Sequence, residues 1–210
     1  MQLHRRDVVD KATQLLDDYG IADLTMRRLA RELSVSPGAL YWHFADKQEL
    51  LGAVADRILE PAAAAVDDPS WSRCVVGLCT SLRNALMSST DGAELVSASF
   101  SAGKSERIVG ILSRLTAAAA EAGIAPPNAD LAARTVLYYV LGFTADEQSR
   151  LQWDAAGALV DGQSVLTENP NARFAFGLKL LVDGIAAHSG GEVNVLQESS
   201  NRRLPVGRPD

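Results

Sequence analysis

The segment from Leu24 to Leu51, LTMRRLARELSVSPGALYWHFADKQELL, constrains the fold of this chain more than any other. Thr25 is a favoured N-cap and predicts a first short helix. Residues 34–36 leave room only for a turn. Ser36 followed by Pro37 predicts a second helix, because the N–H that proline lacks is unsatisfied at a first helical position anyway. Two short helices joined by such a turn are typical of a helix-turn-helix.

The flanking residues predict one helix on each side of this motif. Val8, Ala12, Leu15, Leu16 and Tyr19 form an apolar stripe on a helix from Leu3 to Tyr19, which we expect to cover the back of the motif. Asp46 and Glu49 have the spacing of a capping box. They open a helix from Lys47 to about Leu59, where Pro61 predicts a kink, and the alanines at 62–65 would extend the helix beyond it.

Cations and aromatic residues gather on one side of the motif, and this predicts DNA binding. Residues 27–47 contain Arg27, Arg28, Arg31, Tyr41, Trp42, His43 and Lys47. Duplex DNA requires cations and hydroxyls along two phosphate backbones, with one helix end in the major groove. Each residue alone has a simpler interpretation, with the arginines in solvent and the aromatic rings in the core. Taken as a set within one helix-turn-helix, they favour a DNA-binding surface.

Charge and composition fit a globular protein without an overall attraction to nucleic acid. The net charge is -6, and residues 1–50 contain seven Lys/Arg and eight Asp/Glu, so DNA binding has to depend on where the cations lie. We expect a cytoplasmic protein, because the sequence shows neither a signal peptide nor a long apolar span. Cys74 and Cys79 are interpreted as reduced, mostly buried residues.

The remainder of the chain predicts a second, all-helical domain. The overall expectation is an all-α protein with a helix-turn-helix domain at 1–50, a ligand-binding and dimerisation domain at 51–188, and a mobile tail at 189–210. The segments LAARTVLYYVLGF and FAFGLKLLVDGI are apolar over more than one face, which predicts burial from two sides. We therefore expect a homodimer, with interface residues Leu131, Val136, Phe174, Leu178, Leu181 and Ile185.

The helix-turn-helix, with YWHF followed by lysine, resembles the DNA-binding domain of the TetR family of bacterial repressors. LGFTADEQ, FAFGLKLLVDGI and DGAEL resemble its tetracycline-repressor type of C-terminal domain. The resemblance implies that Arg27 reaches a base or phosphate and that Tyr41, His43 and Lys47 reach phosphates. Trp42 would pack on a sugar or base methyl, or else in the core. The reading helix would span Pro37 to Phe44, with Gly38 and Ala39 replacing more polar residues.

Departures from that family type alter the expected ligand. The three histidines are His4, His43 and His188, so the ligand core has none and we expect no metal and no cofactor. The resemblance implies that Leu78 and Leu82 occupy the positions of the family's asparagine and phenylalanine drug contacts, and that Val96 occupies the position of its metal-binding histidine. The expected pocket is therefore apolar. Its predicted lining is Trp71, Leu78, Leu82, Leu86, Val96, Phe100, Leu112, Leu115, Tyr139, Phe143 and Glu147.

Two aspects of this pocket stay open in the sequence. Glu147 could accept a ligand hydrogen bond, face solvent or link helices, and Tyr138 or Tyr139 could supply a polar anchor.

The predicted function is a repressor that an apolar small molecule releases from a palindromic operator. The alternative is an all-helical carrier or enzyme without a DNA-binding role, although no motif links the scattered carboxylates and serines into a catalytic site.

Overall fold

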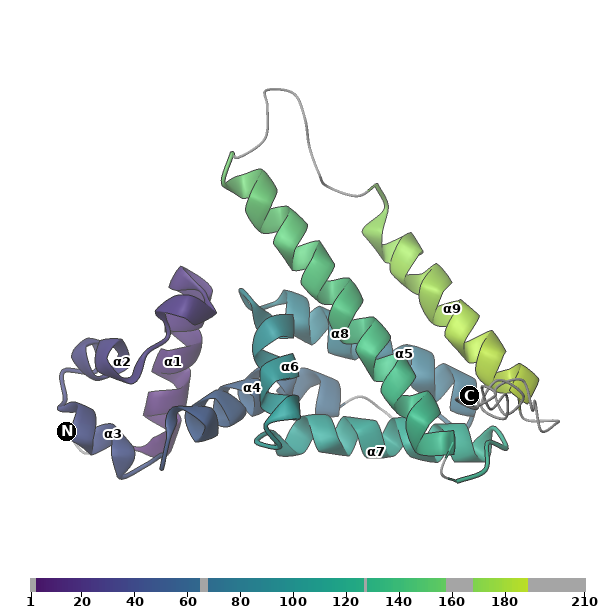
Figure 1. Cartoon of the computed structure of the whole chain (residues 1–210), viewed down its shortest axis with the longest axis horizontal. Coiled ribbons are helices and arrows are strands. Elements are labelled where there is room, and N and C mark those ends of the chain that lie inside the picture. The colour runs from purple at the N-terminus through teal and green to yellow at the C-terminus, as the bar shows by residue number, and fades with distance from the viewer. Residues whose placement is uncertain (1–2, 65–67, 127, 158–167, 189–210) are drawn as a thin grey trace, which may run out of the picture.

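The computed structural model describes residues 3–64, 68–126, 128–157 and 168–188, and within these ranges the chain is helical without strands. Figure 1 shows a small N-terminal bundle joined through α4 to a larger group of helices. The all-α prediction is confirmed. The elements are α1 (Arg5–Tyr19), the 3-10 helix η1 (Ile21–Asp23), α2 (Met26–Glu32), α3 (Pro37–Tyr41), α4 (Lys47–Ala63), α5 (Trp71–Met87), α6 (Gly92–Ser101), α7 (Glu106–Glu121), α8 (Asn128–Ala155) and α9 (Pro170–His188).

Helices α1 to α3 form the reading head around a small apolar core. Leu16, Leu29, Leu40 and Phe44 are buried together, so α1 covers the back of the helix-turn-helix as predicted. The Thr25 side chain accepts a hydrogen bond from the Arg28 amide, which satisfies one of the free N–H groups at the start of α2. The short motif is thus held both by its cap and by its buried face.

The capping predictions at α3 and α4 hold in part. Asp46 accepts a 2.7 Å hydrogen bond from the Glu49 amide, as a capping box requires. The Glu49 carboxylate, however, accepts from the Ala45 amide at 2.8 Å and so reaches one residue further back than expected. Ser36 occupies the N-cap position of α3 without a side-chain hydrogen bond there.

Helix α4 joins the reading head to the rest of the molecule and continues past Pro61, as predicted. It runs to Ala63 with Pro61 inside it. Pro61 lies in the last turn, where the missing N–H removes only one backbone hydrogen bond. The helix ends before Asp68, and residues 65–67 lie outside the described residues.

A close contact fixes α4 to the turn between α6 and α7. A side-chain carbon added to Gly52 would lie 2.1 Å from the Lys104 carbonyl oxygen, so a larger residue does not fit there. One turn further along α4, the Asp56 carboxylate accepts hydrogen bonds from the Ser105 hydroxyl at 2.6 Å and from the Arg107 amide at 3.0 Å. These donors lie at the N-terminus of α7, where N–H groups need acceptors. The turn between α6 and α7 therefore contacts two successive turns of α4 directly.

The C-terminal helices pack around one apolar core, with α9 lying beside α8 (Figure 1). Among the residues with the smallest exposure are Leu78, Leu82, Leu86 and Leu95. Within the described residues, no helix is long and apolar enough to cross a membrane. The predicted tail from Ser189 lies outside these residues.

Candidate DNA-binding surface

The reading helix α3 presents a mostly exposed face to solvent. Pro37, Gly38 and Tyr41 are exposed, while Ala39 and His43 are half-buried. Trp42 is 90% exposed, the highest value among the exposed large hydrophobic residues. The alternative that Trp42 belongs to the core is therefore wrong. Tryptophan is usually well buried. The exposed Trp42 side chain beside exposed Tyr41 therefore indicates a surface that contacts another molecule.

The predicted cations of this surface lie on either side of α3. Arg27 is exposed on α2, and Lys47 is half-buried at the first position of α4. Neither forms an ion pair with another described residue. Arg28, in contrast, pairs with Asp23, and its guanidinium lies 3.7 Å from the centroid of the Tyr19 ring. Arg28 is therefore occupied inside the reading head. Arg27 and Lys47 are the cations positioned for an external anion.

Arg5 supports the reading helix from behind, a role that the sequence did not reveal. Its guanidinium lies 4.1 Å from the centroid of the Phe44 ring and donates hydrogen bonds to the His43 carbonyl and, at 3.0 Å, to Glu49. The hydrogen bond from the Ala45 amide and then the interaction with Arg5 lower the pKa of Glu49 below its usual value. One arginine thus joins α1, the end of α3 and the start of α4.

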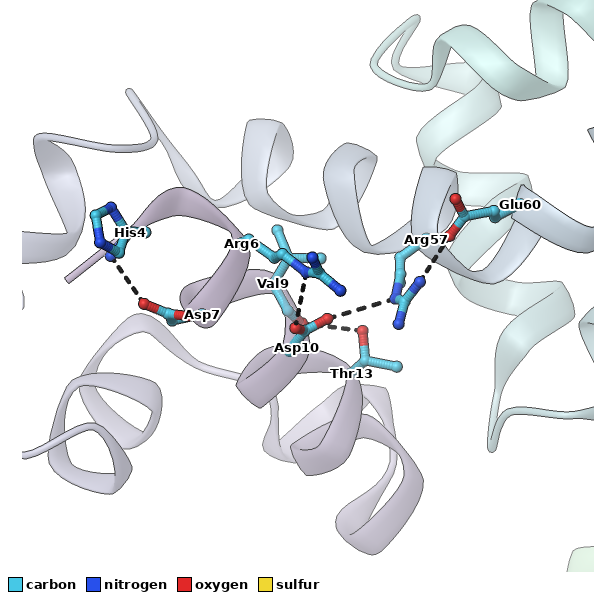
Figure 2. Close-up of polar contacts among 8 residues, drawn as sticks. All are labelled: His4, Arg6, Asp7, Val9, Asp10, Thr13, Arg57 and Glu60. Carbon is cyan, nitrogen blue, oxygen red and sulfur yellow. Dashed lines mark hydrogen bonds and ion pairs between the residues drawn. The ribbon is translucent and has the colours of Figure 1, made fainter.

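A row of alternating charges joins α1 to α4 beside the head (Figure 2). Asp10 lies 3.6 Å from Arg6 and 3.4 Å from Arg57, whose Nη1 is in turn 2.6 Å from Glu60. These side chains are well exposed, so each pair contributes only about 0–1 kcal/mol. The pair with Asp10 therefore does little to hold the Arg6 side chain in place.

Comparison with known proteins gives this surface its context. Residues 8–54 match the bacterial regulatory proteins of the tetR family, and residues 64–160 match the tetracyclin repressor-like C-terminal domain. The class A tetracycline repressor of transposon 1721 from Escherichia coli is 31% identical over 202 residues, which are 88% of this chain and 91% of that protein. The chain belongs to the TetR family. It is accordingly a transcriptional regulator and not an enzyme.

Solved structures of TetR-family regulators share the whole fold. BioQ from Mycobacterium smegmatis is 61% identical, with a TM-score of 0.82 over 89% of this chain and 99% of that one. A structure of BioQ with its natural double-stranded DNA operator is 58% identical, with a TM-score of 0.78 over 89% of this chain and all of the other.

The predicted ligand-binding residues of this TetR-family chain lie mostly inside the packed core. Leu78, Leu82, Leu86, Val96, Leu112 and Leu115 are buried, whereas Trp71, Phe100, Tyr139, Phe143 and Glu147 are half-buried. Tyr139 donates its hydroxyl to the Phe174 carbonyl at 2.8 Å and is already engaged. Tyr138 is exposed, so it faces away from this core and the suggestion that it anchors a ligand there is wrong.

Glu147 links helices, which was one of its predicted alternatives. Its carboxylate forms a bidentate pair with Arg83 of α5, and the same guanidinium donates to Asn171 of α9 at 2.9 Å. The guanidinium also lies 5.1 Å from the centroid of the Phe174 ring. The sequence did not single out Arg83 or Asn171. The available signal was an arginine between Leu82 and Leu86 on an otherwise apolar stripe of α5.

A pocket of about 250 Å³ opens beside this ion pair, at the start of α9. Its lining shares only Phe143 and Glu147 with the predicted ligand site. The other lining residues are Asp146, Arg150, Leu151, Pro170 and Arg173. No group of three or more His, Cys, Asp or Glu that could hold a metal occurs in the part of the chain that the structure describes.

The predicted dimer residues fall on both sides of α8 and α9. Leu131 is exposed and Leu181 is half-buried, as partner-facing residues should be. Val136, Phe174, Leu178 and Ile185 are buried inside the protomer, so assigning them to the interface is wrong. Their apolar character serves the contact between α8, α9 and the core. The outward apolar residues of these two helices are instead Leu131, Tyr138, Leu151, Trp153, Phe176 and Leu180.

Proposed function

We propose that this TetR-family regulator is a homodimeric repressor that binds a palindromic operator and is released by an apolar small molecule. The observation that carries DNA binding is the exposed Trp42–Tyr41 edge of α3, with Arg27 and Lys47 beside it. The 58% identical BioQ, which has been crystallised with its operator, supports this use of the surface. Acting on DNA would place the protein in the cytoplasm.

The roles proposed for the residues of this surface are carried over from the TetR family to the matching positions. Tyr41, His43 and Lys47 would bind phosphates. Lys47 lies at the N-terminus of α4, so the positive end of the helix dipole would add to its attraction for a phosphate. Arg27 would reach a base or phosphate, and Trp42 a sugar or a thymine methyl. Because Pro37, Gly38 and Ala39 offer no side-chain hydrogen bonds to base edges, specificity would depend on methyl contacts and DNA shape.

The experiment is a selection of bound fragments from a random duplex pool by the full-length protein. We expect a palindrome whose half-sites lie about 10 base pairs, or a multiple of that, from centre to centre, because a two-fold dimer presents two α3 helices. Recovery of unrelated sequences would contradict the proposal. Retention on heparin without any selected sequence would indicate only unspecific attraction.

A homodimer would form through the outward face of α8 and α9. Leu131, Tyr138, Phe176 and Leu180 are large apolar residues on these two helices, and more than half of each is exposed. Exposed apolar patches mark interaction sites. The partner's equivalent helices would cover it and complete a four-helix bundle. The two-fold axis of that bundle would then coincide with the axis of the operator.

The ligand would be apolar and would bind without a metal. Leu78, Leu82 and Val96 give this part of the core no donor, acceptor or metal ligand, and they are nearly fully buried. The ligand would therefore have to favour a conformation in which these helices separate, and it shifts the equilibrium only by its difference in affinity for the two states. Displacement of the α6–α7 turn would tilt α4 through Gly52 and Asp56 and move the reading heads out of register.

This part is tested by operator release with long-chain fatty acids, lipophilic dyes and tetracycline, each with and without magnesium. We expect release by an apolar compound irrespective of magnesium. Release by tetracycline alone, and only with magnesium, would contradict the assignment of an apolar, metal-free ligand.

A further inference from the structure

We propose that Asp91 is a positioning residue that attaches the reading head to α8 at a second point, separate from α4. The inference rests on the proposed operator binding by a homodimer. Asp91 lies in the turn between α5 and α6, and one carboxylate oxygen accepts a 2.8 Å hydrogen bond from the amide of Ile21 in η1. The other oxygen accepts from the side-chain amide of Gln152 in α8. One carboxylate therefore bridges the two parts of the molecule.

The residue before Asp91 strengthens the same junction. The Thr90 hydroxyl donates to the Asp17 carbonyl at 3.0 Å, and the Thr90 amide donates to the Asp17 carboxylate at 3.2 Å. Asp17 lies in the last turn of α1, where helix carbonyls have no partner within the helix. The turn thus holds the end of α1 as well as the start of η1.

The backbone is shaped for this contact on both sides. Asp91 has φ +54°, in the left-handed region that costs most residues stability. Gly20, between α1 and η1, has φ +77°, and a side-chain carbon there would lie 2.7 Å from the Asp91 carboxylate. Two residues with positive φ therefore meet at one junction, and each is of a type that adopts this conformation readily.

The turn is itself fixed to α8 through a buried amide. The side chain of Gln148 donates to the Leu86 and Ser89 carbonyls at 3.0 and 2.7 Å and accepts from the Ala93 amide at 3.1 Å. One side chain thus joins the end of α5 to the start of α6. Gln152 follows one helical turn later and holds Asp91, so the turn moves with α8.

A second attachment affects the orientation of the reading head. Helix α4 is the only covalent connection between the head and the C-terminal helices, so noncovalent contacts decide how far the head can rotate relative to those helices. Figure 1 shows α1 facing α6 across the junction between the head and the C-terminal helices. The bonds of Thr90 and Asp91 span this junction and restrict that rotation. In a dimer the restriction sets the orientation of the two α3 helices, and with it the half-site spacing that the protein accepts.

The test compares two palindromic duplexes, the selected operator and the same operator with one base pair inserted at its centre. The variant is Asp91→Gly, which keeps the left-handed backbone and removes both side-chain bonds. No side-chain cap of α6 is lost, because Asp91 makes none. We expect the affinity for the operator to fall about tenfold and the preference over the inserted duplex to shrink by a similar factor.

Two further variants separate positioning from folding. Asp91→Asn should restore the preference, because a flipped Gln152 amide can accept from asparagine while Ile21 keeps its acceptor. Gln152→Ala should reproduce part of the effect without touching the turn, and Glu94→Ala on the exposed side of α6 should change neither affinity. A preference unchanged in both Asp91→Gly and Gln152→Ala would overturn the inference, and so would equal losses on both duplexes. If the native protein selects no operator, the proposed function fails instead.

Discussion

The Arg83 guanidinium and the Glu147 carboxylate form a bidentate pair between α5 and α8, with Nη2–Oε1 and Nε–Oε2 distances of 2.7 and 3.0 Å. Their side chains are only 8% and 14% exposed. Removing one member leaves a buried, unpaired charge. We expect Glu147→Leu to lower the free energy of unfolding by about 3–5 kcal/mol.

Replacing both members should cost less than replacing one. Arg83→Met combined with Glu147→Leu removes the two charges together, so most of the lost stability should return. Urea denaturation of the single and double variants measures this difference. If the double variant loses the sum of the two single losses, the pair is not the coupled unit that its geometry indicates.

Acid should weaken the link between Arg5 and Glu49 in a defined direction. The Ala45 amide and Arg5 lower the pKa of Glu49 below its usual 4.5, so the folded state favours the charged carboxylate. The resulting stability is fully present above pH 4.5 and is lost as the pH falls through the lowered pKa of the folded state. Glu49→Gln should remove this part of the acid sensitivity, and thermal melts from pH 3 to 7 measure the effect. Equal acid profiles for the native protein and Glu49→Gln would show that the link between Arg5 and Glu49 contributes nothing to stability.

Arg5 and Arg6 provide a matched pair for the same region. Arg5→Ala should weaken operator binding, because the His43 carbonyl and the Phe44 ring lose their partner behind α3. Arg6→Ala should leave the stability of the head unchanged, since that side chain is 81% exposed.

Trp42 should serve binding and not folding. Because it is almost fully exposed, Trp42→Ala should leave the melting temperature within about 2 °C of the native value while reducing operator affinity about tenfold. Phe44→Ala, two residues away and buried, should instead destabilise the protein by about 3–5 kcal/mol. Melting curves and fluorescence anisotropy separate the two effects. A large loss of stability in Trp42→Ala would place the indole in the core after all.

Exposed Trp42 and buried Leu178 illustrate what could and could not be predicted from the sequence. Helix periodicity and capping residues predicted the helix-turn-helix and the helix on each side of it, because these are local properties. Leu178 and three other predicted interface residues are instead buried inside the protomer, because a helix apolar all round does not reveal which face its own core covers. The Arg83–Glu147 pair was missed for a similar reason: its members are 64 residues apart, and only the tertiary fold brings them together.

Neighbouring residues of α9 should respond differently to a charge. Leu180→Asp should separate the subunits, because Leu180 is exposed on the proposed dimer face, whereas Leu178→Asp should unfold the protomer, because Leu178 is 2% exposed. Val109→Asp on α7 is the matched control, since Val109 is a similarly exposed apolar residue outside the two helices of the proposed interface. Sedimentation with circular dichroism distinguishes these outcomes. A native protein that sediments as a monomer would contradict the dimer.

The salt dependence of operator binding tests the central claim most directly. Each phosphate contact releases counterions, so the affinity falls with salt along a slope set by the number of contacts. Lys47→Ala should flatten this slope by about one unit and weaken binding to selected and unrelated sequences alike. Combining Arg27→Ala, Tyr41→Ala and Lys47→Ala should abolish specific binding while leaving a folded dimer. Unchanged affinity and slope in that triple variant would contradict the assignment of this surface to DNA.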